Sequence, residues 1–263
     1  MIHSILSDKP TRLFLVLGGF FAANALLAEM IGVKLFQLET LLGTPKADFT
    51  LLGQPHLSFV LSVGVLPWPI VFIMTDVVND YYGVRGVRFL TLLTTGLIAF
   101  AFVVMWFAIH MPAEQGWWIG SSAAQGVPDM QAAFAGVFGQ GMNIIIGSLS
   151  AFVVGQLVDA LSFRAIKRFT GDKRIWLRAT GSTLISQLID SVVVTYMAFW
   201  ILRADFTFAQ CTAMVLTAYM YKFSVALLST PLVYLAHAGV ERYLGRERAG
   251  AMRAAALRMR DEQ

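Results

Sequence analysis

The sequence predicts an all-α membrane protein, a polytopic bundle of six transmembrane helices, on three observations. Of its 263 residues, 57% are hydrophobic and only 14% are charged, and the mean hydropathy is +0.67, values that soluble globular domains do not have. Its apolar residues fall into segments of roughly 20 or more, the length a helix needs to cross about 30 Å of hydrocarbon. Its lysines and arginines gather in alternate loops. We therefore expect one six-helix transmembrane domain over residues 1–240 and a basic cytoplasmic tail over residues 241–263.

The first apolar segment carries Glu29 as its only charge, and it is too long and wrongly flanked for a cleaved signal peptide. In the second, Pro67 and Pro69 remove backbone donors around Trp68, which predicts a kinked or unwound helix near its middle. Broken helices of this kind line binding sites in many transporters, whereas a purely structural kink is the alternative. About four residues join the last two segments, so these are expected to be antiparallel neighbours. The predicted spans are Leu13 to Val33, Leu57 to Val78, Phe89 to His110, Met130 to Leu161, Leu177 to Leu202 and Phe206 to Ala238.

The positions of the basic residues predict the orientation of the chain. With the N-terminus inside, sixteen of the 20 lysines and arginines fall on the cytoplasmic side and three fall outside, while Lys222 lies within a span. Cationic loops resist translocation, so this bias predicts cytoplasmic N- and C-termini. The cytoplasmic set is Lys9, Arg12, Arg85, Arg88, Arg164, Lys167, Arg168, Lys173, Arg174, Arg178, Arg242, Arg246, Arg248, Arg253, Arg258 and Arg260.

Several classes of function are excluded by composition. The net charge of +4 is distributed as membrane topology requires, not as a folded basic face, so we predict no nucleic-acid partner. Cys211 is the only cysteine, and no pair or cluster of cysteine and histidine has metal-ligand spacing, so neither a metal nor another cofactor is predicted. The basic tail fits either a short helix on anionic lipid or a frayed, solvated end.

Two charged residues lie near the middle of the last two spans, Asp190 and Lys222. A charge at mid-bilayer costs about 2.5 to 3.5 kcal/mol on insertion scales, so such residues are candidates for a functional site. Similar depth on antiparallel neighbours makes them plausible partners. The structural alternative is an ion pair that only neutralises both charges. The functional alternative is that Asp190 contacts the substrate or a proton while Lys222 sets the pKa of Asp190.

The pattern Gln-Leu-(Val/Ile)-Asp occurs twice, ending at Asp159 and at Asp190. A spacing of three places amide and carboxylate on one helical face. Gln156 with Asp159, and Gln187 with Asp190, could together offer donors and acceptors to a flat heterocycle, and a carboxylate matches the paired N–H donors of a guanine-like edge. The alternative for Gln156 and Gln187 is hydrogen bonding between neighbouring helices.

Other polar and aromatic residues complete the candidate site. Asn24 falls near the middle of the first span, and Asp76 lies deeper in the second than a helix-end carboxylate needs to be. Asn79 and Asp80 are expected at the membrane interface. Among the aromatic residues, we select Trp68 and Phe72 as candidates to stack on a planar ligand. The predicted substrate-binding residues are Asn24, Trp68, Phe72, Asp76, Gln156, Asp159, Gln187, Asp190 and Lys222.

Together these residues resemble the queuosine precursor transporter family, a branch of the VUT-type vitamin uptake transporters. The resemblance runs through Phe72 to Gly83, Gly155 to Asp159 and Arg174 to Trp200, and ends at Lys222 with Pro231. It implies uptake of 7-deazaguanine precursors of queuosine for tRNA modification, chiefly 7-cyano-7-deazaguanine and 7-aminomethyl-7-deazaguanine. It also implies a fold like that of the substrate-binding component of energy-coupling-factor transporters.

We therefore predict a transporter, not an enzyme, whose partners are the lipid bilayer and a small 7-deazapurine. The first alternative is a binding component of a multi-subunit vitamin or nucleobase transporter. Small residues on the first span, Gly18, Ala22, Ala25 and Ala28, could contact such a partner, or could equally form a homodimer contact. The second alternative is an intramembrane enzyme acting on lipid, for which the scattered histidines and the single Asp76–Asp80 helical acid pair give weak support.

Overall fold

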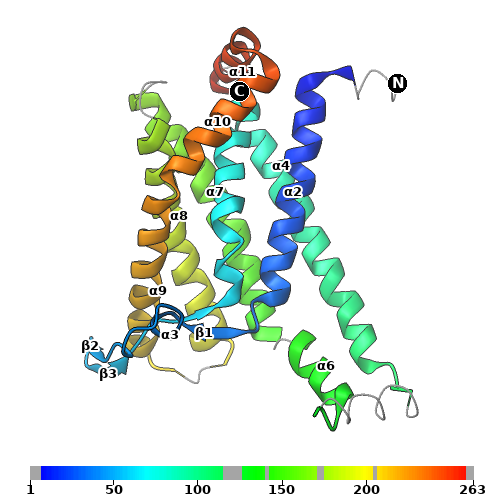
Figure 1. The fold of residues 1–263 in the computed structure, drawn as a ribbon, viewed down its shortest axis with the longest axis vertical. Coiled ribbons are helices and arrows are strands. Elements are labelled where there is room, and N and C mark those ends of the chain that lie inside the picture. Colours follow the sequence, from blue (N-terminus) through cyan, green and yellow to red (C-terminus); the bar gives the residue numbers. More distant parts are fainter. Residues whose placement is uncertain (1–6, 115–125, 140–141, 171–174, 204–205, 259–263) are drawn as a thin grey trace.

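The structure, a computed structural model, describes residues 7–114, 126–139, 142–170, 175–203 and 206–258. It is a bundle of long helices that run along one common direction, with short strands at one end and a C-terminal helix at the other (Figure 1). The elements are α2 (Lys9–Ile31), β1 (Leu35–Gln37), α3 (Leu38–Leu41), β2 (Phe49–Leu51), β3 (Gln54–Leu57), β4 (Val60–Ser62), η1 (Val63–Val65), α4 (Trp68–His110), α6 (Met130–Phe138), α7 (Met142–Thr170), α8 (Ile175–Thr195), η4 (Tyr196–Ile201), α9 (Phe208–Leu228), α10 (Thr230–Leu244) and α11 (Arg246–Arg258).

Five helices in the described part of the chain are long and apolar enough to cross a membrane. One of them contains α4, whose 43 residues would measure about 65 Å if straight, twice the thickness of the hydrocarbon. At Gly83, however, the backbone leaves the helical region (φ 71°, ψ −178°), and the two arms of α4 run in opposite directions (Figure 1). Counted as two crossings, this hairpin accounts for the predicted second and third spans. The all-α polytopic bundle is therefore confirmed.

The prediction of a helix kinked at its middle by Pro67 and Pro69 is wrong. The chain reaches this point through β4 and η1, and α4 begins at Trp68 with proline in its first turn. Proline is favoured there because its missing N–H would have no partner inside the helix in any case. The two prolines therefore start the first arm of α4 and place Trp68 at its end.

Two further predicted spans are divided. The fourth does not begin at Met130, because α6 ends at Phe138 and α7 begins at Met142. The sixth is two helices, α9 and α10, separated at Ser229. Pro231 lies in the first turn of α10, where it lacks the N–H needed to continue α9.

The described segments that the charge pattern assigns to the same side of the membrane lie together at one end of the bundle (Figure 1). One end of the bundle holds the start of α2, the turn within α4, the C-terminal end of α7, the start of α8, and α11 (Figure 1). The opposite end carries two small antiparallel sheets, in which Phe36 pairs with Leu61 and Phe49 with Leu57. Of the basic residues assigned to the cytoplasm, Lys173, Arg174 and Arg260 lie outside the described residues.

Helix α11 shows that the basic tail is not a frayed end over its described residues. Ala256 packs against Gly83, where an added Cβ would lie 3.3 Å from the Ala256 carbonyl oxygen. Arg253 Nη2 donates to Glu241 Oε1 at 2.7 Å, and Arg164 Nη2 donates to the Leu257 carbonyl at 3.2 Å. The tail therefore packs on the bundle at the turn of the α4 hairpin.

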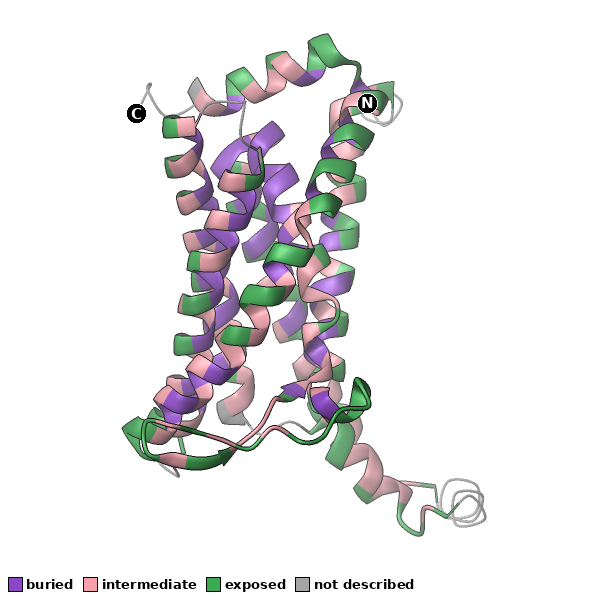
Figure 2. Cartoon of the chain, turned by 60° about the vertical axis from the view of Figure 1, so that its left-hand side comes forward, coloured by how far each residue is buried: buried purple, intermediate pink, exposed green. Residues whose placement is uncertain are grey.

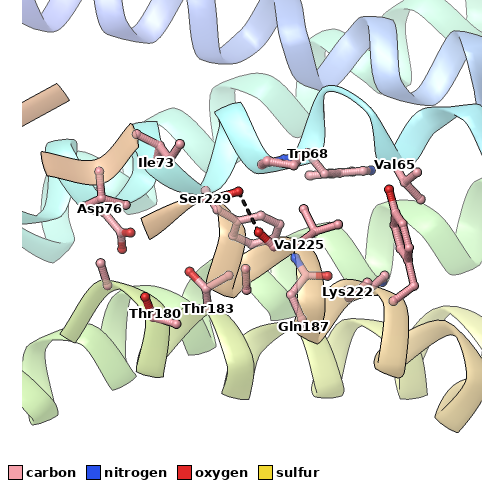
Figure 3. Close-up of a pocket in the computed structure, with 16 residues that line it drawn as sticks. Val65, Trp68, Ile73, Asp76, Thr180, Thr183, Gln187, Lys222, Val225 and Ser229 are labelled. Atoms are coloured by element: carbon pink, nitrogen blue, oxygen red, sulfur yellow. Dashed lines mark hydrogen bonds between the residues drawn. The ribbon is translucent and has the colours of Figure 1, made fainter. Parts of the chain in front are cut away.

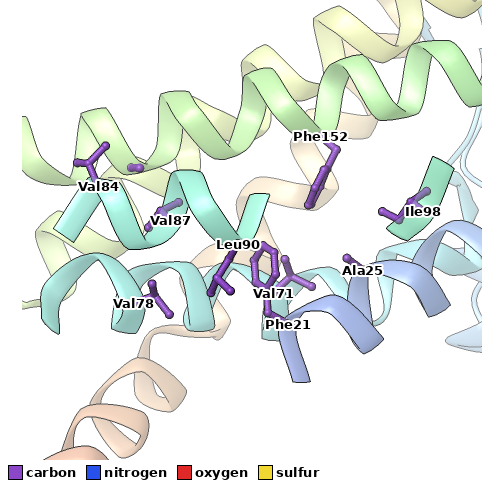
Figure 4. Close-up of a cluster of buried hydrophobic side chains, with 10 residues drawn as sticks. Phe21, Ala25, Val71, Val78, Val84, Val87, Leu90, Ile98 and Phe152 are labelled. Carbon is purple, nitrogen blue, oxygen red and sulfur yellow. The ribbon is translucent and has the colours of Figure 1, made fainter. Parts of the chain in front are cut away.

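The apolar core is small and joins α2, both arms of α4 and α7 (Figure 4). The exposed positions lie on the outer faces of the helices (Figure 2), and many of them carry large apolar side chains, as expected where lipid is the solvent. The proposed partner contact on the first span is wrong for Gly18, Ala25 and Ala28, because these residues are buried within the chain itself. An added Cβ at Gly18 would lie 2.7 Å from Leu90 of α4.

Gly83 is the position where the hairpin requires glycine. Its φ of 71° with a ψ of −178° is reached almost only by glycine, so Gly83→Ala should lower the free energy of unfolding by about 1 to 3 kcal/mol. Thermal unfolding of the detergent-solubilised protein measures this. The control is Gly96→Ala in the second arm, where an added Cβ meets nothing within 4 Å. Equal melting temperatures for the two variants would contradict this role of Gly83.

Candidate functional site

A cavity lies between the first arm of α4, α8, α9 and the start of α10 (Figure 3). It encloses about 540 Å³ of space, part of which is open to solvent. Its walls are mainly apolar, with a few polar groups, as in sites that bind small organic molecules. The lining residues are Val65, Trp68, Pro69, Phe72, Ile73, Asp76, Ala179, Thr180, Thr183, Gln187, Tyr221, Lys222, Val225, Ala226, Ser229 and Val233.

One wall of the cavity is aromatic. Trp68 and Phe72 lie four residues apart on the first arm of α4, so they share a helical face, and their ring centroids are 5.9 Å apart. Phe152 of α7 supports Trp68 from another direction, with a centroid distance of 5.8 Å. Both aromatic residues selected from the sequence therefore line the cavity. Their faces can stack on a flat ring system.

The other wall carries the polar groups of α8 and α9. Lys222 Nζ lies 2.6 Å from Asp190 Oδ2, which confirms the predicted ion pair. The two side chains are 20% and 22% exposed, so the pair is only partly buried. Gln187, nearly one turn before Asp190, also lines the cavity (Figure 3). An amide, an ammonium group and the carboxylate paired with it are therefore brought together beside the aromatic wall.

Asp76 closes one end of the cavity (Figure 3). Its side chain is 1% exposed, and its Oδ1 atom has no hydrogen-bond partner among the described residues. Buried acceptors are seldom left without a donor. Asp76 Oδ1 is thus available to a donor that enters the cavity.

Four of the residues selected from the sequence do not line the cavity: Asn24, Gln156, Asp159 and Asp190, the last of which is paired with the lining residue Lys222. Gln156 Oε1 accepts a hydrogen bond from Thr75 Oγ1 at 2.7 Å, so it joins two helices as the structural alternative held. Asp159 Oδ1 accepts from Ser186 Oγ at 3.0 Å. Asn24 Nδ2 donates to the Phe20 carbonyl of its own helix at 2.8 Å.

The chain matches one protein family over residues 62–236, described as "Putative vitamin uptake transporter". The chain belongs to this family. The matched segment contains all the residues that line the cavity, while Asn24 lies outside it. This family member is accordingly a multi-pass membrane protein and a transporter.

Three relatives carry more specific names. The chain is 32% identical over 183 residues to the "Probable queuosine precursor transporter" of Bacillus subtilis (strain 168), covering 66% of this chain and 71% of the relative. It is 25% identical over 180 residues to the protein of the same name from Haemophilus influenzae, covering 68% and 69%. It is 23% identical over 175 residues to the "Queuosine precursor transporter" of Escherichia coli (strain K12), covering 65% and 70%. No solved structure matches the chain, so the likeness to energy-coupling-factor components stays a prediction.

In this transporter, sequence reasoning missed a buried charge cluster centred on Asp80. Asp80 was expected at the interface, but it is 0% exposed, and it forms ion pairs with Lys167 and with Arg178, whose Nη2 lies 2.9 Å from Asp80 Oδ2. His237 Nδ1 of α10 lies 3.6 Å from the same oxygen. In the sequence, Lys167 and Arg178 were assigned to cytoplasmic loops as orientation signals, so their pairing with Asp80 was not predicted. The available signal was the spacing of Asp76 and Asp80, which places Asp80 on the inward face of the helix.

The Asp80 cluster should stabilise the packing of α4, α7 and α8. Asp80→Asn leaves two buried cations without their carboxylate, so we expect a loss of about 3 to 5 kcal/mol in the free energy of unfolding. The control is Asp8→Asn, which removes an ion pair with Arg248 whose side chains are 51% and 38% exposed, and should cost under about 1 kcal/mol. Thermal unfolding in detergent compares them, and equal losses would contradict the structural role of Asp80.

Proposed function

We propose that the chain imports queuosine precursors across the bacterial inner membrane: 7-cyano-7-deazaguanine, 7-aminomethyl-7-deazaguanine or a related 7-deazapurine. The observation that carries the proposal is the cavity, which sets an aromatic wall opposite convergent polar groups. The names of the three relatives support the same class of substrate. The protein acts as a carrier and leaves its substrate chemically unchanged.

The chemistry of the cavity fits a guanine-like ring. A 7-deazaguanine is flat, so its faces stack between Trp68 and the opposite wall. Its edges carry both N–H donors and a carbonyl acceptor. Gln187 offers an amide with both functions, Lys222 offers a donor, and the free oxygen of Asp76 accepts from an N–H group. Asp190 contributes by fixing the Lys222 ammonium group.

The position of the cavity suits alternating access. It lies between the first arm of α4 and the α8–α9 pair, so relative movement of these helices would open it to one side and close it to the other. Short strands lie at one end of the bundle and the Asp80 cluster at the other. The distribution of basic residues supports placing the Asp80 end and both termini in the cytoplasm.

The proposal predicts a ranking of affinities for the purified chain. Titration of the detergent-solubilised protein should show that 7-cyano-7-deazaguanine or 7-aminomethyl-7-deazaguanine binds more tightly than adenine, whose hydrogen-bonding edge lacks the guanine pattern. Tryptophan fluorescence or calorimetry measures the affinity. Equal affinity for adenine, or the absence of binding, would contradict the proposed substrate class.

A substitution tests whether this cavity is the binding site. Gln187→Ala removes an amide with two hydrogen-bonding functions from the cavity, and loss of about 1.4 kcal/mol or more should weaken binding about tenfold. The control is Ser224→Ala, because Ser224 is exposed on α9 and, among the described residues, its hydroxyl donates only to the Met220 carbonyl of its own helix. Unchanged affinity in Gln187→Ala would place the site elsewhere.

A further inference from the structure

Four carboxylates are buried or half-buried where α4, α7, α8 and α9 pack, and they fall into two groups. Asp80 is neutralised by Lys167 and Arg178, and Asp190 by Lys222. Asp76 and Asp159 form no ion pair with any described residue, although they are 1% and 0% exposed. Ionised carboxylates without a partner are very costly in such surroundings. A positive charge is therefore needed at this position.

Two hydrogen bonds fix the relative position of Asp76 and Asp159. On one side, Thr75 Oγ1 of α4 donates to Gln156 Oε1 of α7 at 2.7 Å. One turn further along, Asn79 Nδ2 of α4 donates to the Ala160 carbonyl of α7 at 2.8 Å. Asp76 follows Thr75 and Asp159 precedes Ala160, so the same contact between helices holds both carboxylates. The charge of Asp159 therefore acts on Asp76 across this contact.

Each carboxylate of the pair keeps one oxygen without a hydrogen-bond partner in the described part of the chain, Oδ1 of Asp76 and Oδ2 of Asp159. Ser186 is bonded to the other oxygen of Asp159. The nearby Ser182 gives its hydrogen to the Ala179 carbonyl at 3.0 Å. Two buried acceptors without a donor, on carboxylates that flank the same contact between helices, define a site for something that supplies a donor or a charge.

We propose that Asp76 and Asp159 share one transported proton and that this carboxylate pair couples solute uptake to the proton gradient. The proposal rests on the function proposed above. Two free oxygens suit a proton, whereas protein-bound metal ions generally take four or more ligands. Two carboxylates that share a site bind one proton readily, because both cannot stay ionised side by side.

The geometry also gives the pair a route to the solute. Asp76 lines the cavity and Asp159 does not, so the proton enters through Asp76 and passes to Asp159. With the proton on Asp159, the Asp76 carboxylate accepts an N–H group of the solute. Proton and solute are then held together, as symport requires, and one proton is released inside with each solute molecule. No other bond forms or breaks.

The charged groups around the pair are already engaged. On α4, Asp80 lies one turn from Asp76 and is held by Lys167 of α7 and Arg178 of α8. His237 of α10 faces Asp80. Arg178 acts electrostatically on Asp76 but is bonded to Asp80, so it reduces the excess negative charge without supplying a donor to the pair.

The test uses the purified full chain in liposomes loaded with a pH-sensitive dye, in sodium-free buffer, with 7-cyano-7-deazaguanine as solute. Under an inward proton gradient of one pH unit, one-to-one symport should concentrate the solute about tenfold. Addition of solute without a gradient should acidify the interior. Exchange of labelled for unlabelled solute, which needs no net proton movement, reports transport itself.

Asp159→Asn should lose both accumulation and acidification while exchange continues. The matched control is Asp129→Asn, because Asp129 caps α6 outside the bundle core and asparagine caps equally well; it should accumulate solute like the unaltered protein. Accumulation by Asp159→Asn would overturn the carboxylate-pair proposal.

If Asp159→Asn does not fold, the same measurements of exchange, acidification and accumulation on the unaltered chain test proton coupling. Exchange without acidification, or accumulation driven by a sodium gradient instead, would overturn proton coupling while leaving the transport function intact. Absence of exchange in the unaltered chain would instead overturn the proposed function.

Discussion

The cost of placing charge in hydrocarbon governs how this bundle packs. The Asp80 cluster neutralises buried charges from three helices at once, since Asp80 on α4 holds Lys167 on α7 and Arg178 on α8. The same end contains the Gly83 turn, on which α11 packs. These contacts hold the helices together at this end of the bundle. The cavity bounded by α4, α8 and α9 instead offers polar groups to a solute.

The buried polar residues divide by what they do. Gln156 and Asn79 join α4 to α7 through bonds within the protein. Lys222, paired with Asp190, and Gln187 face the cavity. Asp76 belongs to both groups, because it sits at the α4–α7 contact and also lines the cavity. Its position is what connects recognition of a flat solute with the carboxylate pair behind it.

The sequence predicted the parts of this structure that depend on local or strictly periodic rules. Span lengths and charge bias gave the helical bundle, and similar depth on adjacent spans gave the Lys222–Asp190 pair. It failed where a residue's role depends on tertiary contacts. Pro67 and Pro69 predict a kinked helix from the sequence because the composition does not reveal the short strands that precede them. In the structure they lie at the start of α4. Asp80 was expected at the membrane interface because its partners, Lys167 and Arg178, lie in distant segments of the sequence.

Site-directed thiol labelling tests whether a solute occupies the cavity between the aromatic wall and α9. In a chain carrying Cys211→Ala, Val225→Cys places a thiol in the cavity, and Thr44→Cys places one in an exposed loop. Reaction with a water-soluble thiol reagent is timed with and without 7-cyano-7-deazaguanine. Bound solute should slow labelling at position 225 and leave the rate at position 44 unchanged. Equal rates at position 225 with and without saturating solute would contradict occupancy of the cavity.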